Sequence, residues 1–310
     1  MLNEGKEYII ITPAKNEEDN LPGLITSIRH QKRKPKVWII VDDGSTDNTK
    51  NLIRHAELEE SWIHGLILSS TNTYNIEEHY ADVCRSGFDY AIHLAKNSNI
   101  PFQYIALSDA DMLYPETYFS ALIDFLEIHP DFGIISGSLA IKDKNGIIYQ
   151  ENKVIPGNDQ VLGTGRVWRL ATFSQTGGYL RVRAPDWVST ILAISHGWKT
   201  AQIPDIICYQ TRDTGGKITL WQGYFKRGQR LYYLNSNLLN IVNTTFDIIF
   251  ISRQKNSFKK SIALICGYCY SVISRDEQIS IQEVKQYSGS YKRVLYLYIQ
   301  FIRNLFSKDH

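Results

Sequence analysis

The chain has 310 residues, of which 43% are hydrophobic and 21% are charged; this composition excludes disordered and fibrous proteins and suits two modest domains or one large α/β domain. The net charge of +2 is the sum of two unlike parts: residues 1–210 hold 19 Lys and Arg against 26 Asp and Glu (−7), and residues 211–310 hold 15 against 6 (+9). We therefore expect an acidic body followed by a basic C-terminal region.

Short apolar runs alternate with amphipathic helical patterns in the first half of the chain. The expected strands are Tyr8–Thr12, Val37–Val41, Gly65–Leu68 and Tyr104–Leu107. The expected helices between and after them are Leu21–His30, Thr46–Leu58, Tyr80–Ala95 and Pro115–Ile128. This alternation is typical of βαβ units and predicts an α/β fold, with a Rossmann-like, mostly parallel sheet and helices on both of its faces. Ligands of such sheets bind at the carboxyl ends of the strands.

After residue 139 the alternation loosens. The sequence predicts a helix over Trp187–His196, a short strand near Ala201–Ile203 and a basic helix over Leu220–Asn235. The Asn-rich stretch Asn235–Thr245 is expected to link the body to the basic region. These expectations divide the chain into a body of residues 1–235 and a helical, basic C-terminal region of residues 236–310.

Three of the predicted strands end in polar or acidic segments. The first strand runs into Thr12–Glu18, the second into Asp42–Asp47 and the fourth into Ser108–Asp111. Two of these segments present carboxylates, which would repel an anionic ligand unless a cation lies between them. Mg²⁺ and Mn²⁺ prefer such oxygen ligands and bridge to diphosphates, so Asp109 and Asp111 are candidate metal ligands. Taken singly, an Asp-Asp-Gly-Ser run equally fits an Asx turn with a helix cap, and Asp-x-Asp pairs arise often by chance.

Together, and in this order, the three segments resemble the inverting glycosyltransferases of family 2, which have the GT-A fold. The resemblance rests on Pro13–Glu17, Val41–Asp47 and Asp109–Asp111 and covers roughly residues 7–230. It implies a nucleotide-sugar donor (a UDP- or GDP-sugar), a divalent cation (Mn²⁺ or Mg²⁺) and a single-displacement transfer of one sugar to an acceptor hydroxyl. It also implies a nucleotide-sugar-binding half over about residues 1–112 and an acceptor half over residues 113–235.

Carried over by position, the resemblance implies which residues contact the donor. The loop after the first strand would line the nucleotide through Pro13, Ala14, Asn16 and Glu17. Asp43, with Asp42, would contact the base or the ribose. Arg85 would contact the diphosphate or the ribose, with a plain surface role as the equal alternative.

The Asp-x-Asp segment carries the metal in this resemblance. Asp109 would lie near the ribose and the metal, and Asp111 would bind the metal through the donor diphosphate. Ala110, between them, is included in the donor-binding segment.

The family also has a Gly-Gly-aromatic segment followed by an acidic pair that begins a helix. Here Gly177, Gly178 and Tyr179 precede Pro185-Asp186. Asp186 matches the second acid, which serves as the general base, and Pro185 replaces the first. Such a base accepts the proton of the acceptor hydroxyl, while the metal neutralises the leaving diphosphate. Trp187, beside the base, is expected to contact the acceptor.

The segment Trp221–Gly228 lies where family members often carry a basic motif that closes over the donor phosphates. Arg227 or Lys226 would serve here, and a solvated basic helix face is the alternative. The Gln-x-x-Arg-Trp motif of processive polysaccharide synthases is absent from the sequence. Transfer of a single sugar is therefore favoured over polymerisation.

Two apolar stretches in the basic region bear on membrane contact. Ser261–Ser274 holds 14 uncharged residues, fewer than the roughly 20 that a spanning helix needs. Residues between Tyr291 and Leu305 alternate at helical spacing with basic residues at the edges, which predicts an amphipathic helix. That helix either packs on the body or lies on an anionic membrane surface. Because the first apolar run is too short for the core of a signal peptide, we expect a cytoplasmic protein, with peripheral attachment to the membrane as the open alternative.

The four cysteines, Cys84, Cys208, Cys266 and Cys269, are too scattered for a disulfide framework. Cys266 and Cys269 form a lone C-x-x-C inside an apolar run, where small packing residues are favoured over a metal or redox site.

The acceptor remains open between a glycan and a lipid-linked molecule. A polyprenyl-phosphate sugar synthase is the near alternative, because an anionic phosphate acceptor needs less base catalysis and would tolerate Pro185. A catalytically inactive nucleotide-sugar-binding protein is the alternative of another class. No nucleic-acid partner is expected, because the basic region lacks a recognised motif and its charges are spread among aliphatic runs.

Overall fold

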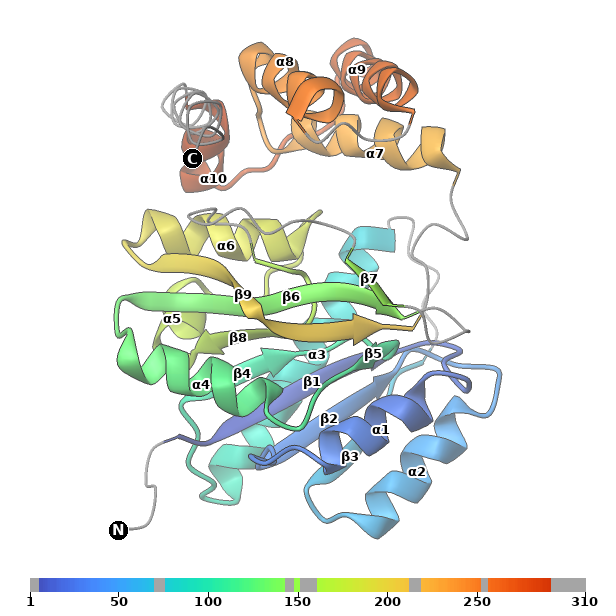
Figure 1. Ribbon diagram of the computed structural model, residues 1–310, viewed down its shortest axis with the longest axis vertical. Helices are drawn as coiled ribbons and strands as arrows, with labels where there is room; N and C mark the ends of the chain where they lie inside the picture. Colours follow the sequence, from blue (N-terminus) through green and yellow to red (C-terminus); the bar gives the residue numbers. More distant parts are fainter. Residues whose placement is uncertain are drawn as a thin grey trace. The chain divides into compact units, whose positions relative to one another are not determined.

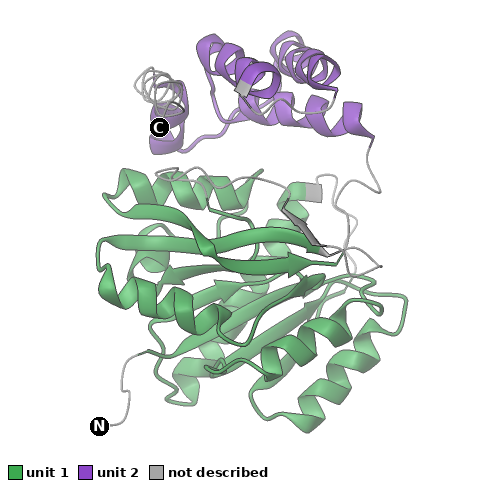
Figure 2. Ribbon diagram, viewed as in Figure 1, with its two compact units in different colours: residues 1–213 green, residues 214–310 purple. Residues whose placement is uncertain are grey.

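The computed structural model (Figure 1) describes residues 6–69, 76–142, 148–150, 161–211, 219–251 and 256–290. The chain divides into two compact units, residues 1–213 (unit 1) and 214–310 (unit 2), as Figure 2 shows. The division lies ahead of the expected boundary at residue 235. The basic helix expected over Leu220–Asn235 therefore belongs to unit 2 rather than to the body.

Unit 1 is built on a sheet whose nine described strands follow the order β3-β2-β1-β4-β8-β6-β9-β5, with β7 paired to β6. The strands are β1 (Tyr8–Ala14), β2 (Val37–Asp42), β3 (Ile63–Ile67), β4 (Tyr104–Leu107), β5 (Met112–Leu113), β6 (Phe132–Lys142), β7 (Ile148–Gln150), β8 (Arg166–Arg169) and β9 (Lys199–Gln210). The four strands predicted in the first half pair in parallel. The later strands pair antiparallel except for β6 with β9, so the completed sheet is mixed.

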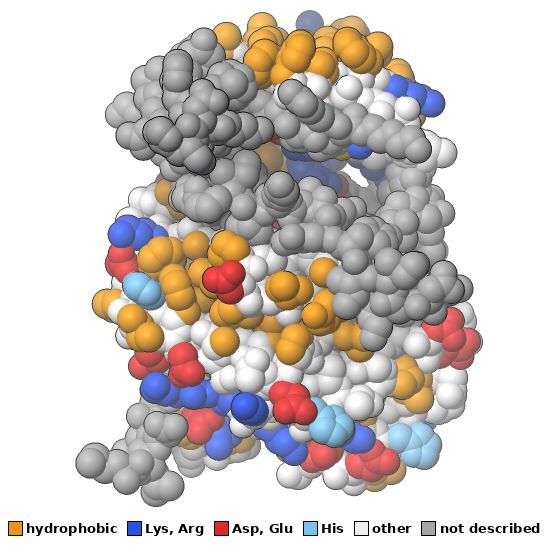
Figure 3. Space-filling model, in the orientation of Figure 1, with side chains coloured by type: hydrophobic (Ala, Val, Ile, Leu, Met, Phe, Trp, Pro, Cys, Tyr) orange, Lys and Arg blue, Asp and Glu red, His pale blue; other side chains and the backbone are white. Residues whose placement is uncertain are grey.

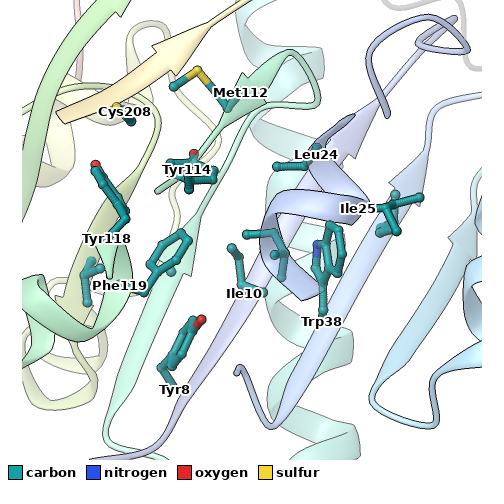
Figure 4. Close-up of a cluster of buried hydrophobic side chains, with 14 of the residues drawn as sticks. Tyr8, Ile10, Leu24, Ile25, Trp38, Met112, Tyr114, Tyr118, Phe119 and Cys208 are labelled. Carbon is teal, nitrogen blue, oxygen red and sulfur yellow. The ribbon is translucent and has the colours of Figure 1, made fainter. Parts of the chain in front are cut away.

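Helices cover both faces of this sheet, as predicted. They are α1 (Leu21–Arg29), α2 (Thr49–Glu59), α3 (Ile76–Asn97), α4 (Tyr118–Ile128), α5 (Leu170–Gln175) and α6 (Pro185–Ser195). Tyr8 and Ile10 of β1 point into a core with α1, α2 and α4, whereas Ile9 and Ile11 point into a second core with α3. Figure 4 shows part of the first core, where Ile10 and Trp38 lie near Leu24. Strands buried on both faces explain why the predicted runs are apolar throughout.

Unit 2 is helical. It contains α7 (Leu220–Tyr233), α8 (Leu238–Phe246), a π-helical turn η1 (Asp247–Ile251), α9 (Ser257–Ser274) and α10 (Gln282–Gly289). Two glycines let α7 and α9 pack backbone to backbone: a Cβ on Gly228 would lie 2.0 Å from the carbonyl oxygen of Leu264, and one on Gly267 would lie 1.9 Å from that of Phe225. Within the described ranges, no helix has both the length and the apolar character needed to cross a bilayer.

The second half of the chain differs from what its sequence predicted. The link expected over Asn235–Thr245 is wrong, because most of it forms α8, whose first turn is capped by the Asn237 side chain accepting from the Asn240 backbone N–H at 2.9 Å. The short strand near Ala201–Ile203 is part of the longer β9. The amphipathic helix expected between Tyr291 and Leu305 lies outside the described residues.

Candidate functional site

The loops after β1 and β2 interlock through polar side chains. The backbone N–H of Asn16 donates to Ser45 Oγ at 2.9 Å, and the Asn16 side-chain oxygen accepts from the N–H of Thr46 at 2.8 Å. The N–H of Glu17 donates to Thr49 Oγ1 at 2.8 Å. Asn16 holds a left-handed conformation (φ 56°), which Asn tolerates better than most residues. The structure therefore brings the two predicted nucleotide-binding segments into one fixed frame.

Asp42 and Asp43 end β2 and are both buried. The carboxylate of Asp42 accepts from the backbone N–H of Ser45 at 3.1 Å. Asp43 contacts two cationic or titratable groups: Lys15 Nζ lies 3.0 Å away and His79 Nε2 lies 2.8 Å away. Neither Lys15 nor His79 was singled out from the sequence, because nothing local links either residue to Asp43, 28 positions after Lys15 and 36 positions before His79.

Asp109 follows β4 and is held by its surroundings. The Tyr80 hydroxyl of α3 donates to Asp109 Oδ1 at 2.8 Å, and the Asp109 backbone N–H donates to Thr164 Oγ1 at 2.8 Å. Burial raises the pKa of Asp109 to about 7, and the negative charge of Asp111 adds to the rise. The ionised forms of these two carboxylates therefore disfavour one another.

Asp111 lies between β4 and β5, close to β9. The side-chain amide of Gln210 donates to Asp111 Oδ2 at 3.0 Å, and the N–H of Thr211 donates to the Asp111 carbonyl at 2.9 Å. The Thr211 hydroxyl also donates to the side chain of Asn20, just before α1, at 2.9 Å. Ala110, between the two acids, is buried. The end of β9 thus fixes the Asp-x-Asp segment, a relation that only the sheet order creates.

Asp186 lies in the first turn of α6. Its Oδ1 accepts from the Tyr179 hydroxyl at 2.8 Å and lies 3.8 Å from Arg166 Nη1. Arg166 is fully buried; its guanidinium also donates to the Asp186 carbonyl and to Ser189 Oγ, both at 3.0 Å. The Asp186 side chain is 31% exposed, so Tyr179 and Arg166 orient its carboxylate while solvent still reaches it.

One buried thiol connects the two acidic regions. Burial raises the pKa of Cys84 well above its usual value, and the charges of both Asp109 and Asp186 raise it further. Tyr80 and Tyr179 also act on this thiol by hydrogen bonding. Gly163 and Thr164 link the same two acids: a Cβ on Gly163 would lie 2.7 Å from Asp186 Oδ2, and Thr164 Oγ1 accepts from the Asp109 N–H at 2.8 Å. Asp109 and Asp186, 77 positions apart in the chain, are therefore close in the fold. The family resemblance implied that both acids serve one reaction, but no local pattern predicted that side chains of α3 lie between them.

The remaining predicted site residues are placed as follows. Pro13 and Trp187 are partly buried, at the end of β1 and in the first turn of α6. Arg85 lies on an exposed face of α3, with Nε 3.6 Å from Asp89 of the same helix, and not in the acidic cluster. Arg227 is an exposed residue of α7, stacked on Tyr224. Because it belongs to unit 2, its contact with the donor phosphates stays a prediction.

The acidic cluster of Asp109, Asp111 and Asp186 concentrates negative charge in a small region. No group of three or more His, Cys, Asp and Glu side chains within the described segments is arranged to hold a metal ion by itself. Two oxygen-bearing residues, Asp109 and Asp111, fit a hard divalent cation that takes its other ligands from a diphosphate. The donor set is thus suited to a shared metal rather than to a structural one.

Comparisons with known proteins identify the family and the fold of the chain. The model of the family described as Glycosyl transferase family 2 matches residues 9–184, a segment that ends two positions before Asp186. No sequence among the curated proteins matched the chain.

Solved structures share the fold at low sequence identity. The structure of S. aureus TarS 1–349 in complex with UDP-GlcNAc aligns with a TM-score of 0.57 and 15% identity, covering 87% of this chain and 82% of that one. The mannosyltransferase PcManGT from Pyrobaculum calidifontis, in complex with GDP-Man and Mn²⁺, aligns with a TM-score of 0.51 and 14% identity, covering 98% and 88%.

Proposed function

The chain belongs to glycosyl transferase family 2 and is a glycosyltransferase of the GT-A fold, and we propose that it transfers one sugar from a nucleotide-sugar donor to an acceptor hydroxyl with inversion. The meeting of Asp109, Asp111 and Asp186 is the observation that carries the proposal. Asp109 and Asp111 come from the segment between β4 and β5, and Asp186 comes from the start of α6. Thr164, which accepts from the Asp109 N–H, follows Gly163, which lies against the Asp186 carboxylate. This arrangement supports donor binding and proton removal at one anomeric carbon.

The nucleotide is proposed to lie on the frame formed by the loops after β1 and β2. Pro13, Ala14, Asn16 and Glu17 would line it, with Asp42 and Asp43 directed to the base or ribose. Lys15 and His79 support this role, because two partners hold the Asp43 carboxylate in one orientation. The ligands in the two fold neighbours, UDP-GlcNAc and GDP-Man, favour a UDP- or GDP-sugar.

A divalent cation, Mn²⁺ or Mg²⁺, is proposed to be held by Asp111 and Asp109. The crowding of carboxylates supports this, and so does the Mn²⁺ in the PcManGT structure. When bound, the cation would supply Lewis-acid neutralisation of the leaving diphosphate. Asp111→Asn is expected to abolish the Mn²⁺-dependent part of the thermal stabilisation by the donor; full retention of it would remove Asp111 from the metal site.

Asp186 is proposed as the general base. As the acceptor oxygen forms its bond to the anomeric carbon, the bond from that carbon to the diphosphate breaks and the acceptor proton passes to the Asp186 carboxylate. One displacement from the face opposite the diphosphate inverts the anomeric configuration. The hydrogen bond from Tyr179 and the buried guanidinium of Arg166 support the assignment, because they orient a carboxylate that solvent still reaches.

A thermal-shift screen of UDP-, GDP- and dTDP-sugars with Mn²⁺ tests the donor. We expect one nucleotide class to raise the melting temperature and to be hydrolysed slowly without acceptor. Asp186→Asn should then lose transfer by about a hundredfold or more while its donor stabilisation persists. A wild-type protein that binds a donor and transfers to no acceptor class would instead be the inactive binding protein.

The acceptor is proposed to be a glycan or a lipid-linked molecule, met at an anionic membrane surface through the basic C-terminal region. Pro185 in place of an acid favours one further candidate, a polyprenyl-phosphate sugar synthase. A phosphate acceptor arrives already deprotonated. In that case Asp186→Asn would lower transfer much less with a polyprenyl phosphate than with a hydroxyl acceptor.

A further inference from the structure

Most of the large hydrophobic side chains that are exposed in the described ranges belong to unit 2. Of the 17 large hydrophobic side chains that are exposed in the described ranges, 12 belong to unit 2, which is less than a third of the chain. Six of them define what we call the apolar face: Leu238, Val242, Phe250, Phe258, Ile262 and Ile273. Figure 3 shows hydrophobic side chains gathered over α8 and α9. A concentration of this kind marks an interaction surface.

The α9 helix has its polarity inverted relative to a helix on a water-soluble protein. Of the residues that α9 buries, only Leu264 is large and apolar; the others are Ser261, Ala263, Gly267 and Ser271, and Gly267 packs against the backbone of α7. The exposed side of α9 carries Phe258 and Ile273, 70% and 81% exposed. An amphipathic helix whose outer side faces water shows the opposite order. The outer side of α9 is therefore built for an apolar medium.

The α8 helix and the η1 turn repeat this pattern. Leu238 and Val242 are four residues apart, so they lie on one side of α8, and both are exposed. Phe250 of η1 is exposed as well. The opposite side buries Ile241 and a polar residue, Asn240, whose amide donates to the Ser288 carbonyl. Ile241 shares a small core with Leu264 of α9. Two neighbouring elements thus turn apolar sides outward.

The net charge of unit 2 indicates which apolar medium the face contacts. Residues 214–310 hold 14 Lys and Arg against 5 Asp and Glu, a net charge of +9. Exposed Lys259 and Arg275 stand at the two ends of α9, and the helix contains no acidic residue. Two copies of such a unit would repel each other, whereas anionic lipid headgroups attract it. Apolar side chains with basic flanks are the composition of helices that lie in a bilayer interface.

We propose that the apolar face of α8, η1 and α9 docks in the interfacial layer of an anionic lipid bilayer, with Lys259 and Arg275 among the headgroups. The helices lie on the membrane and do not cross it, in keeping with their length. The docking itself does not depend on the proposed function. Only its consequence rests on that function: a glycosyltransferase docked in this way would meet a lipid-linked acceptor at the membrane surface.

Co-sedimentation of the full chain with vesicles tests the docking. We expect binding to vesicles of phosphatidylcholine with phosphatidylglycerol, and much weaker binding to phosphatidylcholine alone. The double variant Ile262→Asn/Ile273→Asn should bind the anionic vesicles about tenfold or more weakly. Both side chains are exposed, so the fold should be kept, and circular dichroism checks this. The matched control is Leu58→Asn, an 85% exposed residue of α2 in unit 1, which should bind as the wild type does.

Two exposed cysteines on α9 provide a second measurement. Cys266 and Cys269 are exposed, whereas Cys84 and Cys208 are buried. In a Cys266→Ser variant, an environment-sensitive fluorophore on Cys269 should shift its emission to the blue when anionic vesicles are added. An unchanged spectrum would place α9 in water and overturn the docking.

Other outcomes also count against the proposal. It fails if the wild type binds neither kind of vesicle, or if Leu58→Asn loses as much binding as the double variant. It fails too if size exclusion shows a dimer that the double variant dissociates while vesicle binding is unaffected, because the face would then join two copies. Vesicle binding needs no nucleotide sugar, and the donor screen needs no vesicles, so the two proposals fail separately.

Discussion

The Tyr179 hydroxyl donates a 2.8 Å hydrogen bond to Oδ1 of Asp186. Tyr80 makes the corresponding bond to Asp109, also at 2.8 Å. Burial raises the pKa of both phenols well above the usual value, so both remain protonated donors at neutral pH. The proposed base Asp186 and the proposed metal ligand Asp109 are thus each held by a tyrosine hydroxyl.

Tyr179→Phe tests this relationship for the proposed base. The variant keeps the ring packing against Phe88 but removes the donor, so Asp186 loses an orienting contact. We expect kcat to fall by about tenfold with little change in the KM for the donor, because this hydroxyl bonds to the proposed base. Steady-state kinetics at varied donor concentration check it. Tyr90→Phe, at an exposed position of α3, should behave as the wild type; a large rise in donor KM for Tyr179→Phe would contradict the base-positioning role.

Gly163 leaves room for the same carboxylate. A Cβ at this position would lie 2.7 Å from Asp186 Oδ2, too close for either group to remain in place. Gly163→Ala should therefore displace Asp186 and lower transfer by about tenfold, while thermal stabilisation by the donor is retained. A methyl group added at Gly223 meets nothing within 4 Å, so Gly223→Ala is the control for a glycine-to-alanine change. Full activity of Gly163→Ala would show that the position of Asp186 Oδ2 is unimportant.

Asp109 should make stability depend on pH in a definite direction. Its pKa is raised from 3.8 to about 7, so between these values the folded protein keeps a proton that the unfolded chain has lost. Stability then falls as pH rises through this window, by roughly 4 kcal/mol at most. Asp109→Asn removes the charge, so its melting temperature in EDTA should exceed that of the wild type at pH 8 and by much less at pH 5. Asp89→Asn, at an exposed residue, should show no such pH-dependent gain.

The thiols should divide into two classes. Cys84 and Cys208 are buried, and burial raises the pKa of both, to about 12 for Cys208. Only Cys266 and Cys269 should react with Ellman's reagent in the native protein, against four thiols in denaturant. Raising the pH from about 7 to about 9 should speed the reaction of Cys266 and Cys269, because the reaction rate depends on the fraction of thiolate. No third cysteine should begin to react. A third native thiol at pH 9 would mean that the environment of Cys84 or of Cys208 is open to solvent.

Much of the first half of the fold could be predicted from sequence. The strands that became β1 to β4 are apolar runs bounded by polar turn residues, and such local patterns decide local structure. The strand-end motifs and the family resemblance followed from the same runs. Asp186 was singled out by the family resemblance, as the second acid of a pair that begins a helix. Sequence reasoning missed Lys15, His79, Tyr80 and Arg166, whose partners lie far away in the chain.

The sequence by itself determined the alternation of strands and helices and the chemistry at the ends of the strands, because both depend on residues close together in the chain. Only the tertiary structure decided that β8, a four-residue segment with arginine at both ends, lies inside the sheet between β4 and β6. It also decided that Asn-rich residues form α8, and that Asp109 and Asp186 meet across Cys84. These outcomes depend on contacts between segments that are distant in the chain. The free energy of such contacts comes from burying side chains, and a local sequence pattern does not show which distant segments will be buried together.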